Sequence, residues 1–263
     1  YRTYSRNING RQESWNDVCI RVTEGTFSIR KDWYIKNHIN WDEDYWQDYA
    51  KEFIEYLFNM YWLPPGRGLW AMGTDFIYQR GSMALYNCAA CKISDNIGDD
   101  IAWLMDCLML GVGVGFSPIR NDNLQIYNNE RSYENIIPDS REGWVDSVKQ
   151  QIDSYLYNKP YPIHNYSLIR KAGTPIKSFG GICSGPESLQ KFHEFIDKCF
   201  YRYKNELSYD SVRLKIDLAN ACGICVVAGN VRRSAELACL SIKDPIFMDL
   251  KNIFKVLSQV SVD

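Results

Sequence analysis

The residues of this chain best suited to chemistry are its thiols. Nine cysteines occur among the 263 residues, and two pairs have the C-x-x-C spacing, Cys88/Cys91 and Cys222/Cys225. Such pairs serve as redox dithiols or as metal ligands. About 130 residues separate the two pairs, far more than the gap within a zinc ribbon, and the chain has only three histidines. The spacing therefore disfavours a metal site.

The composition indicates reduced thiols in a cytoplasmic protein. The number of cysteines is odd, and several of them, such as Cys107 and Cys225, lie inside apolar runs. We find no apolar run long enough to span a bilayer, and residues 1–12 lack the apolar stretch of a secretory signal. A net charge of −2 gives no electrostatic reason to expect nucleic acid or an anionic membrane as partner.

Cys88 is the strongest single candidate for a reactive group. It follows Asn87 in a short apolar run, residues 85–93, that reads as a strand. Cys91, three residues on, should then point to the opposite face of the strand, and we expect it to be structural. From the residues alone, Cys88 is either a reductant thiol or a buried structural cysteine.

Two glycine-rich segments could contact a ligand. Glycines alternate through residues 111–116, and Gly113 lies in an expected buried strand, where glycine usually marks the close approach of a backbone or a ligand. The segment does not match G-x-G-x-x-G, so a dinucleotide site is disfavoured. Residues 177–185 combine Lys177 with Gly180 and Gly181, which suits contact with a base or phosphate but equally suits a simple turn.

The elements that must position these residues fall into two regions. Residues 13–23 and 42–60 carry apolar side chains at helical spacing, and prolines at 64 and 65 follow the second helix. Beyond them, expected strands at 85–93, 112–118, 176–182 and 234–242 alternate with expected helices at 101–110, 139–157, 188–203 and 210–223. This alternation predicts an α/β fold with a largely parallel sheet.

Three finer expectations accompany this scheme. Asp139 should cap the helix over 139–157, with Glu142 completing a capping box. Residues 120–138, rich in Asn, Asp and Tyr, read as a surface insertion. Residues 158–166, which contain two prolines, read as a loop.

In their order and separations, five segments resemble the monomeric, adenosylcobalamin-dependent (class II) ribonucleotide reductases. The segments are residues 63–74, 85–91, 111–116, 177–185 and 226–237, and the start at residues 2–6 is also similar. The resemblance has departures: Gly68 stands where some relatives have Thr, and Asn230 and Ser234 stand where the family has Gly and Thr. Arg232 and Arg233 of the last segment would bind a phosphate or brace the barrel by pairing with Glu236.

The resemblance implies an N-terminal helical region over residues 1–62. The first part of a ten-stranded α/β barrel would follow over residues 63–263, incomplete in this chain, with an effector-site insertion around residues 118–166. The implied reaction converts ribonucleoside triphosphates to 2′-deoxyribonucleoside triphosphates by a thiyl-radical mechanism. Its implied cofactor is adenosylcobalamin, its allosteric effector a deoxynucleotide and its reductant a thioredoxin-like protein.

The resemblance also suggests roles for single residues. Cys88 matches one thiol of the pair that is oxidised as the substrate is reduced. Substrate-binding candidates are Asn87, Gly113, Gly180 and Gly181, and effector-binding candidates are Asp99, Asp139 and Lys177.

The family's radical-bearing Asn-Pro-Cys-x-Glu loop does not occur in the sequence. We therefore expect the partner thiol, the thiyl cysteine and the glutamate to lie beyond this chain, in a longer protein or in a complementary chain. Three alternatives remain open: another branch of the reductase superfamily, a non-catalytic deoxynucleotide-binding remnant or split subunit, and a thiol-redox or zinc module built on the C-x-x-C pairs.

Overall fold

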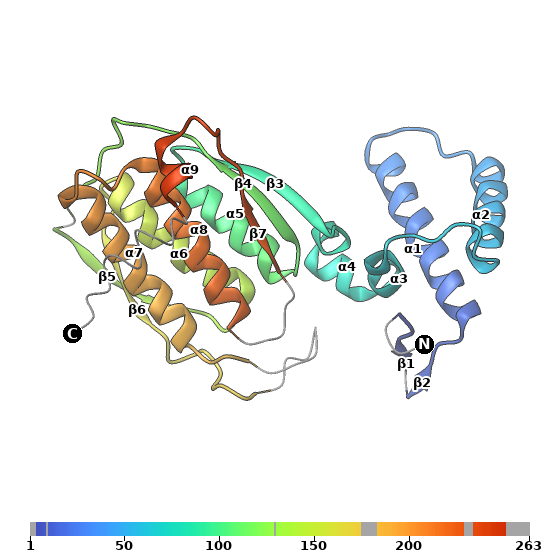
Figure 1. Ribbon diagram of the computed structural model, residues 1–263. Coiled ribbons are helices and arrows are strands. Elements are labelled where there is room, and N and C mark those ends of the chain that lie inside the picture. The colour runs from blue at the N-terminus through green and yellow to red at the C-terminus, as the bar shows by residue number, and fades with distance from the viewer. Residues whose placement is uncertain (1–3, 9, 129, 175–182, 229–233, 251–263) are drawn as a thin grey trace, which may run out of the picture. The chain divides into compact units, whose positions relative to one another are not determined.

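The computed structural model describes residues 4–8, 10–128, 130–174, 183–228 and 234–250 (Figure 1). Contacts divide the chain into two units, Tyr1–Asn87 and Cys88–Asp263. The first unit contains β1 (Asn7–Ile8), β2 (Arg11–Gln12), α1 (Trp15–Lys36), α2 (Glu43–Phe58), α3 (Gly66–Ala71), α4 (Asp75–Arg80) and the 3-10 turn η1 (Ser82–Leu85). None of the helices among the described residues is long and apolar enough to cross a membrane.

Helix α1 begins at a capping box and extends well past its predicted end at Thr23. The Ser14 hydroxyl accepts a hydrogen bond from the amide of Asp17, and the Asp17 carboxylate accepts one from the amide of Ser14. The helix continues through Gly25, although glycine weakens helices. The reason is packing, because a Cβ at Gly25 would overlap the backbone of Gly73.

The first unit has its own small core. It consists of Val18, Cys19, Val22, Leu57 and Leu69, contributed by α1, α2 and α3. Beside it the buried guanidinium of Arg21 pairs with Glu13, with 2.7 Å between Nε and Oε1, and donates to the Leu69 and Met72 carbonyls. The predicted helix over 42–60 is confirmed as α2.

A parallel sheet forms the centre of the second unit. Its strand order is β3 (Cys88–Ile93), β4 (Gly113–Pro118), β7 (Glu236–Ala238). Helix α5 (Ile97–Met109) connects β3 to β4, and both α5 and α8 (Ser211–Val227) pack against the sheet (Figure 1). Exposure alternates along β3 and β4, so one face of the sheet is buried by these helices and the other is open.

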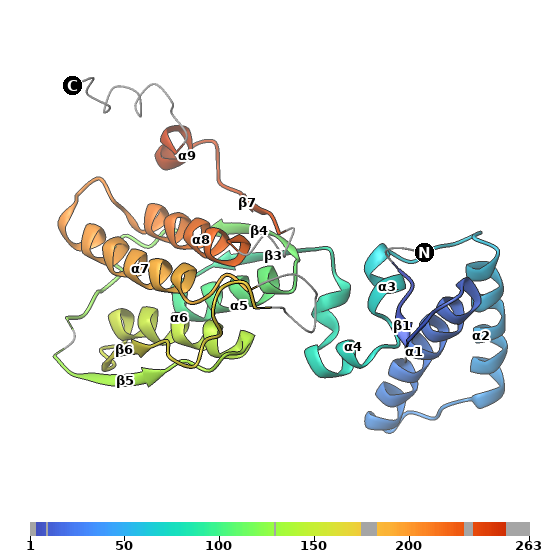
Figure 2. The same ribbon diagram turned by 90° about the horizontal axis from the view of Figure 1, so that it is seen from below.

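The chain between β4 and α8 adds a second layer. Strands β5 (Ser132–Ile136) and β6 (Tyr161–Asn165) form a two-stranded parallel sheet joined by α6 (Arg141–Leu156). Helix α7 (Glu187–Asn205) precedes α8, and the short α9 (Pro245–Asp249) follows β7. Helix α6 packs on α5, and α7 packs on α8 (Figure 2).

These observations confirm the predicted α/β class with parallel strands. They also correct three local predictions. Residues 158–166 are not a loop throughout, because β6 occupies 161–165 and pairs with β5 inside the expected surface insertion. The cap of α6 is Ser140 instead of Asp139, since the Ser140 hydroxyl accepts from the Gly143 amide. The last strand is confined to Glu236–Ala238, and the expected strand at 176–182 lies outside the described residues.

Candidate functional site

Cys88 lies at the start of β3 with its side chain on the open face of the sheet. It is an exposed free thiol. In the parallel register its Cα partner is Gly113 of β4, and Ala90 pairs in the same way with Gly115. Leu237 of β7, in register with Gly115, lies on this face as well and is 65% exposed. The open face therefore presents the Cys88 thiol beside Gly113 and Gly115 of β4, which carry no side chains and together form the glycine strip.

Gly115 of β4 is not required by the packing of the described residues. A Cβ built at Gly115 would meet only the Ala89 carbonyl oxygen, at 3.9 Å, which is an ordinary van der Waals distance. A methyl side chain at this position would thus fit against the neighbouring described atoms. Glycine in a strand without such a local reason marks the approach of a ligand or of another backbone.

Cys91 lies on the opposite face, as its spacing predicted. It is half-buried, in register with the buried Phe116 of β4. Burial, followed by the charges of Asp100 and Glu236, raises the pKa of Cys91 to about 11. A thiol of this kind is almost fully protonated at neutral pH and is a poor nucleophile.

Glu236 brings a buried carboxyl to the helix side of the sheet. Its Oε1 has no hydrogen-bond partner, and a Cβ on Gly223 of α8 would lie 2.5 Å from its Oε2. Gly223 therefore makes room for this carboxyl between β7 and α8. Burial raises the pKa of Glu236 to about 7.

The candidate effector residue Asp99 belongs to a charged network between α5 and α6. Its carboxylate lies 3.2 Å from Nζ of Lys149, which also pairs with the buried Asp153 at 2.7 Å. Lys159 reaches the same Asp153 oxygen at 2.9 Å. Gly98 allows the contact, because a Cβ there would overlap Oδ1 of Asp153.

The second candidate effector residue, Asp139, lies just before α6. It pairs with Arg170 at 2.6 Å. The ion pairs Asp99–Lys149 and Asp106–Arg141 show that α5 and α6 run antiparallel. Asp139 is ten residues before Lys149, or about 15 Å along a helix axis. The structure thus separates Asp99 and Asp139, and their shared role stays a prediction.

Several candidates fall outside the described part of the chain. They are Lys177, Gly180 and Gly181, together with Arg232 and Arg233. Asn87 is exposed and directly precedes Cys88.

His164 and His193 do not offer a free metal ligand. The rings of His164 and His193 stack with their centroids 3.9 Å apart. Both nitrogens of each ring take part in hydrogen bonds, with Asn135 and Gln151 for His164 and with Ser147 and Tyr166 for His193. Burial lowers the pKa of His164 to about 4. Over the described residues, no group of three or more His, Cys, Asp or Glu side chains is placed to hold a metal ion.

Sequence reasoning missed three features of this unit. These are the buried Glu236 beside Gly223, the stacked histidines, and the Asp99–Lys149–Asp153 network. Only the network left a signal, because Lys149 and Asp153 are four residues apart on a helix. The other two depend on contacts between residues distant in sequence.

Comparisons with known proteins agree on one family. A model of the ribonucleotide reductase alpha domain matches residues 1–74, and a model of the insertion domain of B12-dependent ribonucleotide reductase matches residues 117–199. An adenosylcobalamin-dependent ribonucleoside-triphosphate reductase of Euglena gracilis is 38% identical over 95% of this chain. A probable enzyme of the same name from Dictyostelium discoideum is 37% identical over 95%.

A solved structure agrees with the sequence comparisons. The crystal structure of a B12-dependent (class II) ribonucleotide reductase aligns with a TM-score of 0.72 and 25% identity, covering 98% of this chain and 43% of that one. The chain spans 35% of the Euglena protein and 36% of the Dictyostelium protein. It therefore corresponds to only part of each relative.

Proposed function

The chain belongs to the B12-dependent ribonucleotide reductase family, and from this premise we propose that it supplies the Cys88-bearing part of a ribonucleoside-triphosphate reductase. The proposed reaction replaces the 2′-hydroxyl of a ribonucleoside triphosphate with hydrogen. The observation that carries the proposal is the exposed Cys88 thiol beside Gly113 and Gly115 on the open face of a parallel sheet.

Cys88 would act as a reductant. The 2′-hydroxyl leaves as water, and two thiols become one disulfide, which supplies the two electrons that the ribose carbon gains. Cys88 is one of these thiols, and its partner belongs to a segment beyond this chain. Cys91 is unsuited to be the partner, because it lies on the other face of β3 with its pKa raised to about 11.

The substrate would lie across the glycine strip of β4. The room above Gly115 lets a sugar ring approach the backbone next to Cys88. Asn87, which precedes Cys88, is proposed to contribute a further substrate contact, and so are Gly180 and Gly181.

The deoxynucleotide effector is proposed to bind the insertion. We place this insertion around residues 118–166, and the family model matching residues 117–199 supports it. Asp99, Asp139 and Lys177 remain the proposed contacts. A thioredoxin-like protein is proposed to re-reduce the disulfide, and the cytoplasm is the proposed compartment.

Adenosylcobalamin is proposed as the cofactor because the relatives are named as dependent on it. When bound, it would supply the organic radical that initiates the reaction. The imidazoles of His164 and His193 already use both of their nitrogens in hydrogen bonds. We therefore assign neither of them to cobalamin.

The proposal is tested by assaying the protein encoded by the whole reading frame that contains these residues. With adenosylcobalamin, a ribonucleoside triphosphate and a dithiol reductant, the wild type should form deoxyribonucleotide. Cys88→Ser should reduce turnover to the background rate without changing the melting temperature, because the side chain is exposed.

Cys239→Ser is the matched control. Cys239 is also an exposed free thiol of the second unit, but it lies outside β3 and should leave turnover unchanged. Full turnover by Cys88→Ser would refute the assignment of Cys88. Binding of deoxynucleotide by the wild type without any turnover would instead favour the non-catalytic alternative.

A further inference from the structure

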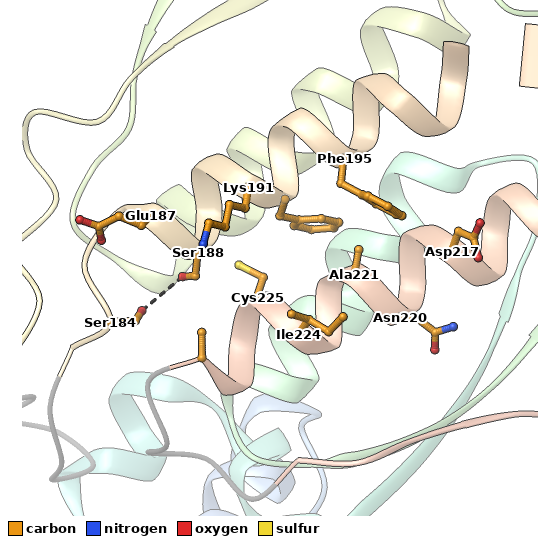
Figure 3. A pocket seen from close by; sticks show the side chains of 12 residues that line it. Ser184, Glu187, Ser188, Lys191, Phe195, Asp217, Asn220, Ala221, Ile224 and Cys225 are labelled. Carbon is orange, nitrogen blue, oxygen red and sulfur yellow. Dashed lines mark hydrogen bonds between the residues drawn. The ribbon is translucent and has the colours of Figure 1, made fainter. Parts of the chain in front are cut away.

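A cavity between α7 and α8 is not used by any step above. Its volume is about 490 Å³, and it is lined from the N-terminal half of α7 and the C-terminal half of α8 (Figure 3). It belongs wholly to the second unit and lies on the side of α8 away from Gly223 and Glu236.

The walls of this cavity are mostly apolar. Phe192 and Phe195 line it from α7, and Ala221 and Ile224 line it from α8. Ile224 is 71% exposed, an unusual position for an isoleucine on a helix that is otherwise largely buried. Partly open apolar walls of this size are typical of sites that bury the body of a small organic molecule.

One end of the cavity carries a positive charge and two hydroxyls. Lys191 forms no hydrogen bond or ion pair with any residue that the structure describes. Ser184 and Ser188 lie at the same end, with their hydroxyl oxygens 3.3 Å apart. Figure 3 shows Lys191 on the Ser188 side of the groove, whereas the carboxylate of Glu187 points away from it.

The negative charge at the far end is already neutralised. Asp217 accepts hydrogen bonds from the hydroxyl of Tyr209 and the guanidinium of Arg213, both at 2.9 Å. Among the lining residues that the structure describes, Lys191 and Glu187 form no ion pair, and because the carboxylate of Glu187 points away from the groove, the charge that faces it is that of Lys191. This charge complements an anion whose apolar body lies along the phenylalanines.

We propose that the groove between α7 and α8 is a binding site for a small organic anion with an aromatic or branched apolar body. The anionic group pairs with Lys191 and the serine hydroxyls, and the body packs between Phe195 and Ile224. The proposal does not depend on the reductase reaction, because it involves neither Cys88 nor the open face of the sheet.

The test uses the aromatic sulfonate 1-anilinonaphthalene-8-sulfonate and its uncharged analogue N-phenyl-1-naphthylamine. Binding is read from the methyl resonance of Ile224 in the isotope-labelled protein, which separates this site from other apolar surfaces. The sulfonate should shift this resonance saturably. Lys191→Ala should weaken its binding about tenfold, the effect of one charge-assisted hydrogen bond.

Further variants distinguish this proposal from a structural role of Lys191. Lys191→Glu should weaken binding of the sulfonate further but leave binding of the uncharged analogue unchanged. Ala221→Trp should prevent binding of both compounds by filling the groove. Lys198→Ala, which removes a charge two turns further along α7 and outside the cavity, should change neither.

Two results would overturn the proposal. One is a sulfonate that does not shift the Ile224 methyl resonance, and the other is equal binding of the sulfonate by wild type and Lys191→Ala.

Discussion

At the scale of single residues, the register of β3 separates two thiols with different chemistry. Cys88 is exposed on the open face, whereas Cys91, on the other face, contacts the helical layer. Because successive side chains of a strand alternate, a spacing of three places the two thiols on opposite sides. The C-x-x-C motif in this strand is therefore not a dithiol.

This difference predicts the order of alkylation by iodoacetamide at pH 8. Cys88 should react rapidly, and Cys91 slowly, because a pKa of about 11 leaves roughly one thiol in a thousand ionised. Peptide mass spectrometry after timed quenching measures both rates. Modification of Cys91 should speed up about tenfold per pH unit below its pKa, and equal rates for the two thiols would contradict the assignment.

Glu236 predicts a loss of stability with rising pH. Its pKa is about 7 in the folded chain and 4.5 in the reference state, so the folded state binds more protons between these values. The stability that the protonated Glu236 carboxyl contributes to the folded state is fully present below pH 4.5 and is lost as the pH rises through 7. Glu236→Gln should therefore be more stable than wild type at pH 8, by about 1–3 kcal/mol, and nearly equal at pH 4.5.

Urea unfolding at several pH values measures this difference. Subtracting the two proteins removes the effect of other titrating groups, including Asp106, whose pKa is also raised by burial. If wild type and Glu236→Gln show parallel pH dependence, the carboxyl is not buried as described.

At the scale of elements, Gly25 explains why α1 is longer than its sequence suggests. Replacing it with alanine should add about 1 kcal/mol of helix propensity. The overlap with the backbone of Gly73 should outweigh this gain, because a backbone cannot rotate away as a side-chain end can. We expect a net destabilisation of roughly 2–4 kcal/mol, measured by thermal or urea unfolding.

Glu24→Ala provides the comparison for this variant. Glu24 is exposed on the same helix, so its replacement should leave stability nearly unchanged. A Gly25→Ala protein as stable as Glu24→Ala would show that α1 and the Gly73 turn do not make this contact.

Arg120 joins three elements of the second unit by charge. It follows β4, pairs with Asp210, the N-cap of α8, and contacts both oxygens of Asp244, the N-cap of α9, at 3.0 and 2.9 Å. Arg120→Ala should cost about 1–2 kcal/mol, given its partial exposure, and increase amide hydrogen exchange in α9. Arg120→Lys cannot bond both carboxylate oxygens in parallel, so its stability should lie between those of wild type and Arg120→Ala. Unchanged amide hydrogen exchange in α9 would show that Arg120 does not hold this helix in place.

Helical periodicity in the sequence predicted helices correctly, whereas the prolines of residues 158–166 wrongly predicted a loop. The apolar spacing over residues 42–60 and 188–203 predicted the helices α2 and α7, and the expected helices at 101–110 and 210–223 form as α5 and α8. The prolines at 160 and 162 argued against a strand, yet β6 forms there. Among the described strands it pairs only with β5, so it is an edge strand, and edge strands tolerate proline. The site was predictable as far as Cys88 and Gly113, whereas Glu236 and the histidine pair depend on the tertiary fold.

At the scale of the whole molecule, the proposed reaction requires more thiols than strands β3 and β4 present on their open face. Reduction of one ribose consumes two thiols. On the described open face of these two strands, Cys88 lies with Ala90, Lys92 and the two glycines. On the other face, burial raises the pKa of Cys91 to about 11, and it raises the pKa of Cys107 on α5 to about 12.

Residues 1–263 expressed alone should therefore form no deoxyribonucleotide, even with adenosylcobalamin and excess dithiol. An external dithiol reduces a disulfide but does not replace a second thiol held next to the substrate, because catalysis depends on positioned groups. The assay is deoxyribonucleotide formation by residues 1–263 and by the whole reading frame under the same conditions. Turnover by residues 1–263 alone would show that both reductant thiols lie within this chain, and the search for the partner of Cys88 would then move to its other eight cysteines.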